Sequence, residues 1–283
     1  MMNKVEIEIK LDKLRKKYNH HEMVSNAGKL NLNGSFGKLN SKWSKLYSPE
    51  TLIQVTLTGQ LCLLMLIERL EQSGISVVSA NTDGICIKTH KSNRNKLESI
   101  CSKWESETNF KLEETGYKSI HFRDVNSYIA IKENGKAKRK GAYANPGLAK
   151  NPTTTICTDA VCEYLINKTP IEKTILDCQD ITKFVSVRNV KGGGVKLWGS
   201  EINTTDIEYL GKVVRWYYAK DVPGEIVYAK SGNKVALSEK AKPLMRLPDR
   251  LPDDIDYDWY IEESNKILEE LGLSSCNNET TVI

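Results

Sequence analysis

The sequence has few of the residues that build metal sites and disulfide frameworks. It contains four histidines in 283 residues, and its seven cysteines are scattered with no Cys-x-x-Cys pair. No zinc-ligand spacing therefore occurs. An odd number of unclustered cysteines is typical of reduced thiols, so we expect a cytoplasmic protein.

Long hydrophobic runs are equally scarce. The best uninterrupted run, residues 61–67, has seven residues and ends at Glu68 and Arg69, whereas a membrane-spanning helix needs roughly 20. The first ten residues lack the apolar core of a secretory signal. These absences predict a protein without a membrane partner.

Charge is unevenly distributed along the chain, although the net charge is only +5. Residues 1–45 contain ten basic and four acidic residues, and residues 118–142 contain seven basic and two acidic residues. Residues 248–283 reverse this balance, with ten acidic and two basic residues. Such stripes suit a polyanion on one side of the molecule. On charge alone, a solvated surface is the favoured interpretation.

Boundary residues and periodicity define one helix clearly. Ser48, Pro49 and Glu50 provide a cap, a proline at the first helical position and an acid in the first turn. This helix is expected to end near Gln72, before Gly74. Its apolar residues recur at helical spacing and predict one buried face, made of Leu52, Val55, Leu63, Leu66 and Leu70.

The remaining pattern predicts an α+β fold, with an antiparallel sheet flanked by helices and then a mainly helical part. We expect further helices over residues 5–19, 22–40, 93–107, 154–168, 170–185 and 259–271. We expect strands over residues 75–80, 85–89, 110–114, 119–122 and 128–132. Residues 191–199 are predicted to form a flexible loop, residues 216–218 an aromatic patch, and Asn145-Pro146-Gly147 a domain boundary.

A first group of residues could contact a nucleotide. Lys29, Asn33 and Phe36 are spaced i, i+4 and i+7, so on a helix they share one face. Gly34 and Gly37 remove bulk beside that face and allow a flat base to approach. The lysine could bind a phosphate, the asparagine could bind the edge of a base in a groove, and the phenylalanine ring could stack on a base. The alternative is an amphipathic helix end with a glycine stop.

A second group lies between the strands expected at 75–80 and 85–89. The segment Ser79-Ala80-Asn81-Thr82-Asp83-Gly84 contains Asp-Gly, a strong signal for a hairpin turn. A tight turn between buried strands can present the Asp83 carboxylate to a metal ion. The alternative is a turn that needs Asp-Gly for backbone reasons only.

Taken together and in this order, the two groups resemble motifs B and C of family B, phage-type DNA polymerases. Lys-x-x-x-Asn-Gly-Ser-Phe-Gly is similar to their Lys-x-x-x-Asn-Ser-x-Tyr-Gly, and Ser-Ala-Asn-Thr-Asp-Gly to their Tyr-Gly-Asp-Thr-Asp-Ser. The resemblance covers about residues 10–272. It implies the end of the fingers in residues 1–45, the palm in 46–145, and the thumb with a C-terminal tail in 146–283.

The resemblance also implies roles for individual residues. Asp83 corresponds to the catalytic carboxylate that holds Mg²⁺ in a two-metal site for nucleotidyl transfer. Lys29 would bind the triphosphate of a deoxynucleoside triphosphate, with Asn33 and Phe36 beside the nascent base pair. Tyr128 and the basic residues Lys138, Arg139 and Lys140 would contact primer–template DNA, where the family has a Lys-Lys-x-Tyr motif and a basic strand.

Several departures qualify this resemblance. Asn81 replaces the first aspartate of motif C, Phe36 lacks the tyrosine hydroxyl of motif B, and no motif A precedes Lys29. We therefore expect a separate N-terminal polymerase segment or subunit that supplies motif A, in the host cytoplasm if the protein is phage-encoded. Two alternatives stay open: an inactive remnant that only binds primer–template DNA, and a protein-interaction domain with a chance match.

Overall fold

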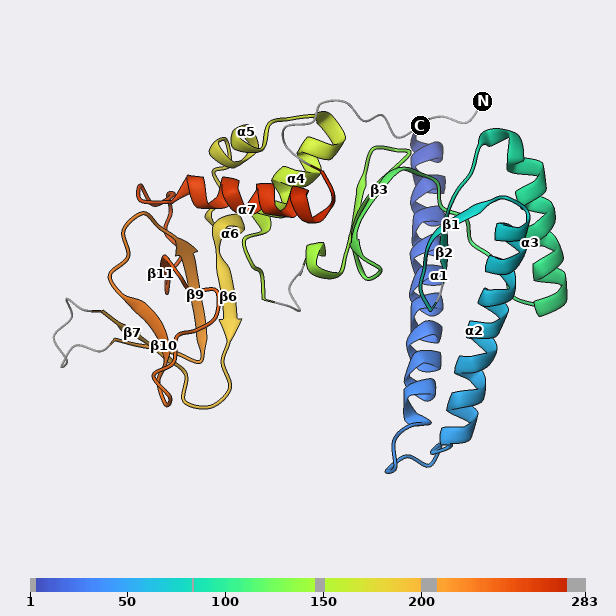
Figure 1. Ribbon diagram of the computed structural model, residues 1–283, viewed down its shortest axis with the longest axis horizontal. Helices are drawn as coiled ribbons and strands as arrows, with labels where there is room; N and C mark the ends of the chain where they lie inside the picture. Colours follow the sequence, from blue (N-terminus) through green and yellow to red (C-terminus); the bar gives the residue numbers. More distant parts are fainter. Residues whose placement is uncertain (1–3, 83, 146–150, 200–207, 274–283) are drawn as a thin grey trace. The chain divides into compact units, whose positions relative to one another are not determined.

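The computed structural model describes residues 4–82, 84–145, 151–199 and 208–273, without the side chains of residues 4–16 and 19. The chain divides into two compact units, residues 1–112 and 113–283. Both contain helices and antiparallel sheet (Figure 1), which confirms the predicted α+β class.

The unit of residues 1–112 contains a two-stranded sheet and three long helices. Its elements are α1 (Lys4–Lys38), α2 (Pro49–Gln72), β1 (Ser76–Ala80), β2 (Ile85–Lys88), η1 (Lys91–Asn93) and α3 (Arg94–Thr108). α1 runs without interruption through the position where the sequence suggested a break between two helices. α2 has the predicted bounds, and Gly74, which follows it, adopts a φ of +75°. No strand forms over 110–114, since Leu112 N–H donates instead to the Glu105 carboxylate on α3 at 2.7 Å.

A small apolar cluster joins α2, α3 and the β1–β2 hairpin. Among the described residues its buried members are Leu66, Leu70, Ile75, Leu97 and Trp104. The Trp104 indole N–H donates to the Cys62 carbonyl at 2.7 Å, and so ties α3 to α2. The predicted buried face of α2 is thus confirmed at Leu66 and Leu70. It is wrong at Val55, which is 51% exposed, because α3 and the hairpin cover only the C-terminal half of α2.

The unit of residues 113–283 contains three three-stranded antiparallel sheets and several helices. The sheets have the strand orders β3-β4-β5, β11-β9-β6 and β10-β7-β8. The strands are β3 (Tyr117–Asp124), β4 (Ser127–Lys132), β5 (Ala137–Lys140), β6 (Ser186–Asn189), β7 (Val195–Trp198), β8 (Glu208–Gly211), β9 (Val213–Tyr218), β10 (Glu225–Tyr228) and β11 (Ala241–Pro243). The helices are η2 (Gly141–Tyr143), α4 (Thr155–Asn167), α5 (Ile171–Leu176), α6 (Ile181–Phe184) and α7 (Tyr257–Glu270).

Two expectations for the second half of the chain were therefore wrong. The part after residue 146 is not simply helical, because strands β6 to β11 form two of its sheets. Residues 191–199 are not all loop either, since β7 occupies residues 195–198. Its alternation of Val195 and Leu197 inside with Lys196 and Trp198 outside is a strand pattern. The adjacent glycines 192–194 led us to predict a loop there instead of a strand.

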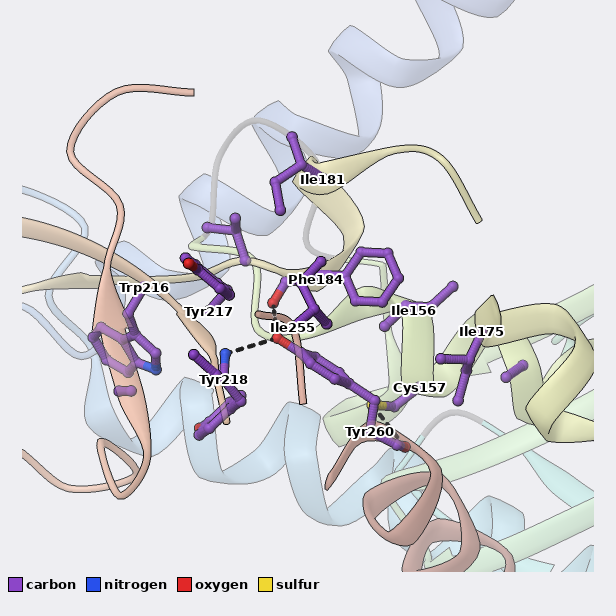
Figure 2. Packing of buried hydrophobic residues seen from close by; sticks show 14 of the residues in the cluster. Ile156, Cys157, Ile175, Ile181, Phe184, Trp216, Tyr217, Tyr218, Ile255 and Tyr260 are labelled. Carbon is purple, nitrogen blue, oxygen red and sulfur yellow. Dashed lines mark hydrogen bonds between the residues drawn. The ribbon is translucent and has the colours of Figure 1, made fainter. Parts of the chain in front are cut away.

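The core of this unit is built around Tyr260 of α7 (Figure 2). Its hydroxyl donates to the Phe184 carbonyl at 2.8 Å and accepts from Tyr218 N–H at 2.9 Å. One buried side chain thereby links α6, α7 and β9. The predicted aromatic patch Trp216-Tyr217-Tyr218 lies in this core, each residue no more than 3% exposed, so it is not available to a ligand.

The strands β3 to β5 belong to this second unit. Ile129 and Ile131 of β4, and Tyr143 of η2, pack in the same apolar cluster as residues of α4 and α7. The boundary that we predicted at residues 145–147 falls inside this unit, and residues 146 and 147 lie outside the described residues. The compact units divide between Leu112 and Glu113.

Candidate functional site

α1 presents the first group of predicted site residues. Lys29, Asn33 and Phe36 all lie within this continuous helix, so their spacing places them on one face. All three side chains are exposed, and a Cβ added at Gly34 or Gly37 would meet nothing within 4 Å. The helix therefore offers an open stripe with a cation, an amide and a ring. Their nucleotide-binding role stays a prediction.

The hairpin predicted around the second group is present. β1 and β2 pair antiparallel, with Ala80 opposite Ile85, and Asn81 N–H donates to the Gly84 carbonyl at 3.0 Å. Asp83, the predicted catalytic residue and metal ligand, lies outside the described residues. Val77 N–H donates to the Glu71 carboxylate at 2.5 Å, which ties the hairpin to the end of α2.

The predicted DNA contacts on β4 and β5 divide between two faces of one sheet. Tyr128 lies opposite Lys140, and Lys138 lies two residues along the same strand, so these three share a face. Arg139 lies opposite the buried Ile129 and points to the other face. From the sequence, residues 138–140 were interpreted as one basic patch, but the pleat of the strand separates its middle member.

Aromatic rings accompany the lysines on the outer face. Lys138 donates to the Tyr117 hydroxyl at 3.0 Å, and this hydrogen bond raises the pKa of Lys138. The rings of Phe122 and Tyr128 lie 5.4 Å apart. Cations interleaved with aromatic rings on a sheet are typical of nucleic-acid-binding surfaces. This arrangement suits the predicted DNA contacts Tyr128, Lys138 and Lys140, whose role stays a prediction.

Arg139 takes part in an internal ion-pair group. Its guanidinium lies 2.7 Å from the Asp159 carboxylate of α4, and Lys183 binds the other oxygen of that carboxylate at 2.9 Å. The three residues line a cavity of about 590 Å³. The Arg139 side chain is only 21% exposed. A phosphate would therefore have to compete with Asp159 for it.

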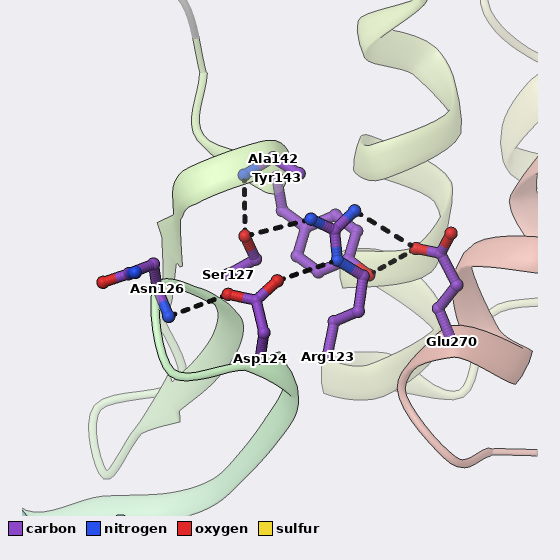
Figure 3. A network of polar contacts seen from close by, with 7 residues as sticks. All are labelled: Arg123, Asp124, Asn126, Ser127, Ala142, Tyr143 and Glu270. Carbon is purple, nitrogen blue, oxygen red and sulfur yellow. Dashed lines mark hydrogen bonds and ion pairs between the residues drawn. The ribbon is translucent and has the colours of Figure 1, made fainter. Parts of the chain in front are cut away.

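A polar network fixes the turn that precedes Tyr128 (Figure 3). The Arg123 guanidinium binds the Asp124 carboxylate at 3.0 Å, the Ser127 hydroxyl at 3.3 Å and the Glu270 carboxylate at 3.7 Å. Glu270, at the end of α7, also accepts from the Tyr143 hydroxyl at 2.8 Å. Burial, followed by this bond, raises the pKa of Tyr143. The network joins the β3–β4 turn to α7 and so positions the face that carries Tyr128.

A glycine is required where this network meets the end of β5. Gly141 has a φ of +62°, and a Cβ there would lie 2.3 Å from the Asn126 carbonyl oxygen. Ala142 N–H then donates to the Ser127 hydroxyl at 3.3 Å. The sequence patterns did not indicate this role of Gly141, nor those of Arg123 and Glu270. Tyr143 and Glu270 are 127 residues apart, and no local pattern links them.

The described residues do not form a metal site on their own. No group of three His, Cys, Asp or Glu side chains that could hold a metal ion occurs among them. Mg²⁺ is usually bound through one or two carboxylates together with substrate phosphates. In this chain only Asp83 is predicted to contribute, so a further carboxylate would have to come from elsewhere.

Comparison with known proteins links the chain to DNA polymerases. No family model matches it. A segment of 124 residues, 43% of the chain, is 27% identical to DNA polymerase 1 of Saccharolobus solfataricus. The chain covers 14% of the length of that protein. This partial similarity supports a relationship to a DNA polymerase, and it does not distinguish between polymerase families.

Proposed function

We propose that the chain is the C-terminal module of a family B, phage-type DNA polymerase. It would bind primer–template DNA and deoxynucleoside triphosphates in the cytoplasm. In the proposal a separate N-terminal segment supplies the motif A carboxylate, and Asp83 shares a pair of Mg²⁺ ions with it. The chain's own task is to orient the nucleotide with Lys29, Asn33 and Phe36 and the primer–template with the outer face of β3–β5.

The main support is the pairing of two local structures with the similarity to a polymerase. The motif B-like residues lie on one helical face, and the strands on either side of the motif C-like residues pair antiparallel. The similar polymerase is much longer than the matched segment, which is 14% of its length.

The exposed surface of α2 also supports a partner. Its apolar residues Ile53, Leu57, Leu61 and Leu64 follow one another at helical spacing, and all are exposed. By length and composition alone, α2 could cross a membrane, a property that its short uninterrupted apolar run did not indicate. We favour a protein partner because the C-terminal half of α2 packs on α3 and the hairpin and carries the ion pair between Arg69 and Glu107.

A second candidate function is an inactive remnant that only binds primer–template DNA. One observation favours it: Asn81 stands where the family has an aspartate. Primer extension with Mg²⁺ separates the two candidates only when the chain is combined with a segment that carries motif A. The purified chain alone should show no extension in either case, because one carboxylate does not hold the ion pair.

The decisive experiment reconstitutes the chain with an N-terminal segment that carries motif A. Asp83→Asn should lower turnover by several orders of magnitude, because it keeps the shape but removes the charge that holds the ions. Asn81→Ala should cost far less, since an amide is a poor Mg²⁺ ligand. Lys29→Ala should weaken nucleotide use more than DNA binding.

Two results would count against the proposal. If Asp83→Asn retains extension while Asn81→Ala abolishes it, the assignment of the metal ligand is wrong. If no N-terminal segment restores extension while the chain still binds primer–template DNA, the inactive remnant is the better description.

A further inference from the structure

The outer face of the β10-β7-β8 sheet carries two exposed aromatic residues. Trp198 is 53% exposed and Tyr209 is 59% exposed, whereas the aromatic residues of β9 lie in the core. Large aromatic side chains on a sheet surface are costly to leave in water, and they often mark a binding site. These two residues are separate from the β3–β5 sheet of the proposed function.

The strand register places both rings on the same face with a lysine between them. Val195 and Leu197 of β7 point into the core, so Lys196 and Trp198 point outward. Lys196 lies directly opposite Tyr209 of β8, which makes Trp198 and Tyr209 diagonal neighbours. Such neighbours have Cα atoms roughly 7–8 Å apart. No ion-pair partner of Lys196 lies among the described residues.

The glycines before β7 make room for this arrangement. A Cβ on Gly194 would lie 2.5 Å from the Tyr209 hydroxyl oxygen, so the end of the Tyr209 side chain occupies the space above that glycine. A Cβ on Gly193 would lie 2.7 Å from Cγ of Lys230, whose stem covers that position. Tyr209 therefore lies across β7 and does not stand away from it. Its side chain nevertheless stays 59% exposed.

Lysines outnumber acidic residues on the described strands and turns around the two rings. The strands β7, β8 and β10 with their bordering turns, residues 191–198, 208–211 and 225–234, carry four lysines and two glutamates: Lys191, Lys196, Lys230, Lys234, Glu208 and Glu225. Glu225 is already paired with Lys234 at 2.9 Å. Lysine is depleted in protein–protein interfaces, whereas lysines beside exposed rings are typical of surfaces that bind single-stranded nucleic acid.

We propose that the outer face of β7 and β8 binds single-stranded nucleic acid, with bases stacked on Trp198 and Tyr209 and a phosphate bound by Lys196. Stacking needs only the flat face of a base, so the surface would accept any sequence. Within the proposed function, it would hold an unpaired stretch of template. In that sense the inference rests on the proposed function, although the binding itself can be measured without polymerase activity.

The test measures binding of a labelled twelve-nucleotide oligo(dT) to the full chain by fluorescence anisotropy. Trp198→Ala and Tyr209→Ala should each weaken binding about tenfold, within the range for loss of one stacked base. Trp198→Phe and Tyr209→Phe keep a ring and should restore most of the affinity. Trp43→Ala is the matched control, because Trp43 is a 97% exposed tryptophan in the other unit, and it should leave binding unchanged.

Salt dependence separates stacking from phosphate binding. Lys196→Ala should reduce the slope of log affinity against log salt by about 0.7, the value for one phosphate on a single strand. Trp198→Ala should lower affinity without changing that slope. A reduction in affinity that the phenylalanine variants do not restore would overturn the stacking arrangement.

Two further outcomes are informative. If wild type does not bind oligo(dT), or if both alanine variants bind it as wild type does, the inference is wrong. If no N-terminal segment restores extension while Trp198→Ala still weakens oligo(dT) binding, the inference stands and the polymerase proposal fails.

Discussion

The two compact units differ in how much apolar surface each buries within itself. Among the described residues, the unit of residues 113–283 contains a cluster of twenty-eight buried apolar residues, and the unit of residues 1–112 contains a cluster of five. Burial of apolar surface supplies most of the free energy of folding. The second unit therefore has the core of an independent domain, whereas the first leaves much of α2 exposed. We expect the first unit to depend on a partner for much of its stability.

The largest effect is expected at the centre of the second unit. Tyr260→Ala should lower the free energy of unfolding by about 3–5 kcal/mol, the range for loss of a buried aromatic residue. It removes the ring and also leaves the Phe184 carbonyl and Tyr218 N–H without their partner. Denaturant unfolding followed by tryptophan fluorescence measures the change. Tyr260→Phe, which keeps the ring, should cost only about 1–3 kcal/mol. Equal losses in the two variants would contradict this description of the core.

The second prediction concerns the exposed stripe of α2. Replacing Leu57, Leu61 and Leu64 by Gln should leave the stability of the isolated chain nearly unchanged, because these side chains are already exposed. Binding of the proposed N-terminal polymerase segment should weaken by at least tenfold, since each leucine buried on binding contributes roughly 1.5–3 kcal/mol. Calorimetry measures the affinity, and Leu176→Gln, an exposed leucine on α5, is the control. Unchanged affinity would mean that this stripe is covered by something else.

The third prediction separates the two faces of β5. The double variant Lys138→Ala, Lys140→Ala should have a shallower slope of log affinity for primer–template DNA against log salt concentration. The slope should fall by about 0.9 for each phosphate that these lysines neutralise in the wild type. Arg139→Ala should leave that slope unchanged and lower the free energy of unfolding instead, because Arg139 is paired with Asp159. Anisotropy with a primer–template duplex, together with denaturant unfolding, gives both quantities. A flatter slope for Arg139→Ala would show that Arg139 also binds phosphate.

The smallest effect is expected in the network at the β3–β4 turn. The pKa of Asp124 is lowered, chiefly because Asn126 N–H donates to its carboxylate, and the bond from Arg123 lowers it further. A lowered pKa in the folded state means that this carboxylate stabilises the fold above its ordinary pKa and loses that effect as pH falls below about 4. Asp124→Asn should remove part of the acid dependence of the unfolding midpoint. An identical pH profile in the variant would show that the network contributes nothing measurable.

Much of the local structure could be predicted because short segments carry their own signals. The bounds of α2 follow from Pro49 and Gly74, although the side chain of Ser48 makes no capping hydrogen bond, and the β1–β2 hairpin forms where Asp-Gly predicted it. The prediction was weaker where the local pattern did not decide between one long helix and two shorter helices. Residues 170–185 were expected to form one helix, but they form the shorter α5 and α6, with Asp180 capping α6 through a hydrogen bond to Thr182 N–H.

The sequence by itself determined the α+β class, the helical stripe of Lys29, Asn33 and Phe36, and the hairpin around residues 81–84. Each depends on residues a few positions apart, whose spacing decides the local backbone. Only the tertiary structure decided which aromatic and basic residues reach solvent. The pleat of β5 turns Arg139 toward Asp159, the core encloses Trp216 and leaves Trp198 exposed, and α7 brings Glu270 to Arg123. These outcomes depend on contacts between residues far apart in the chain, and no local pattern encodes them.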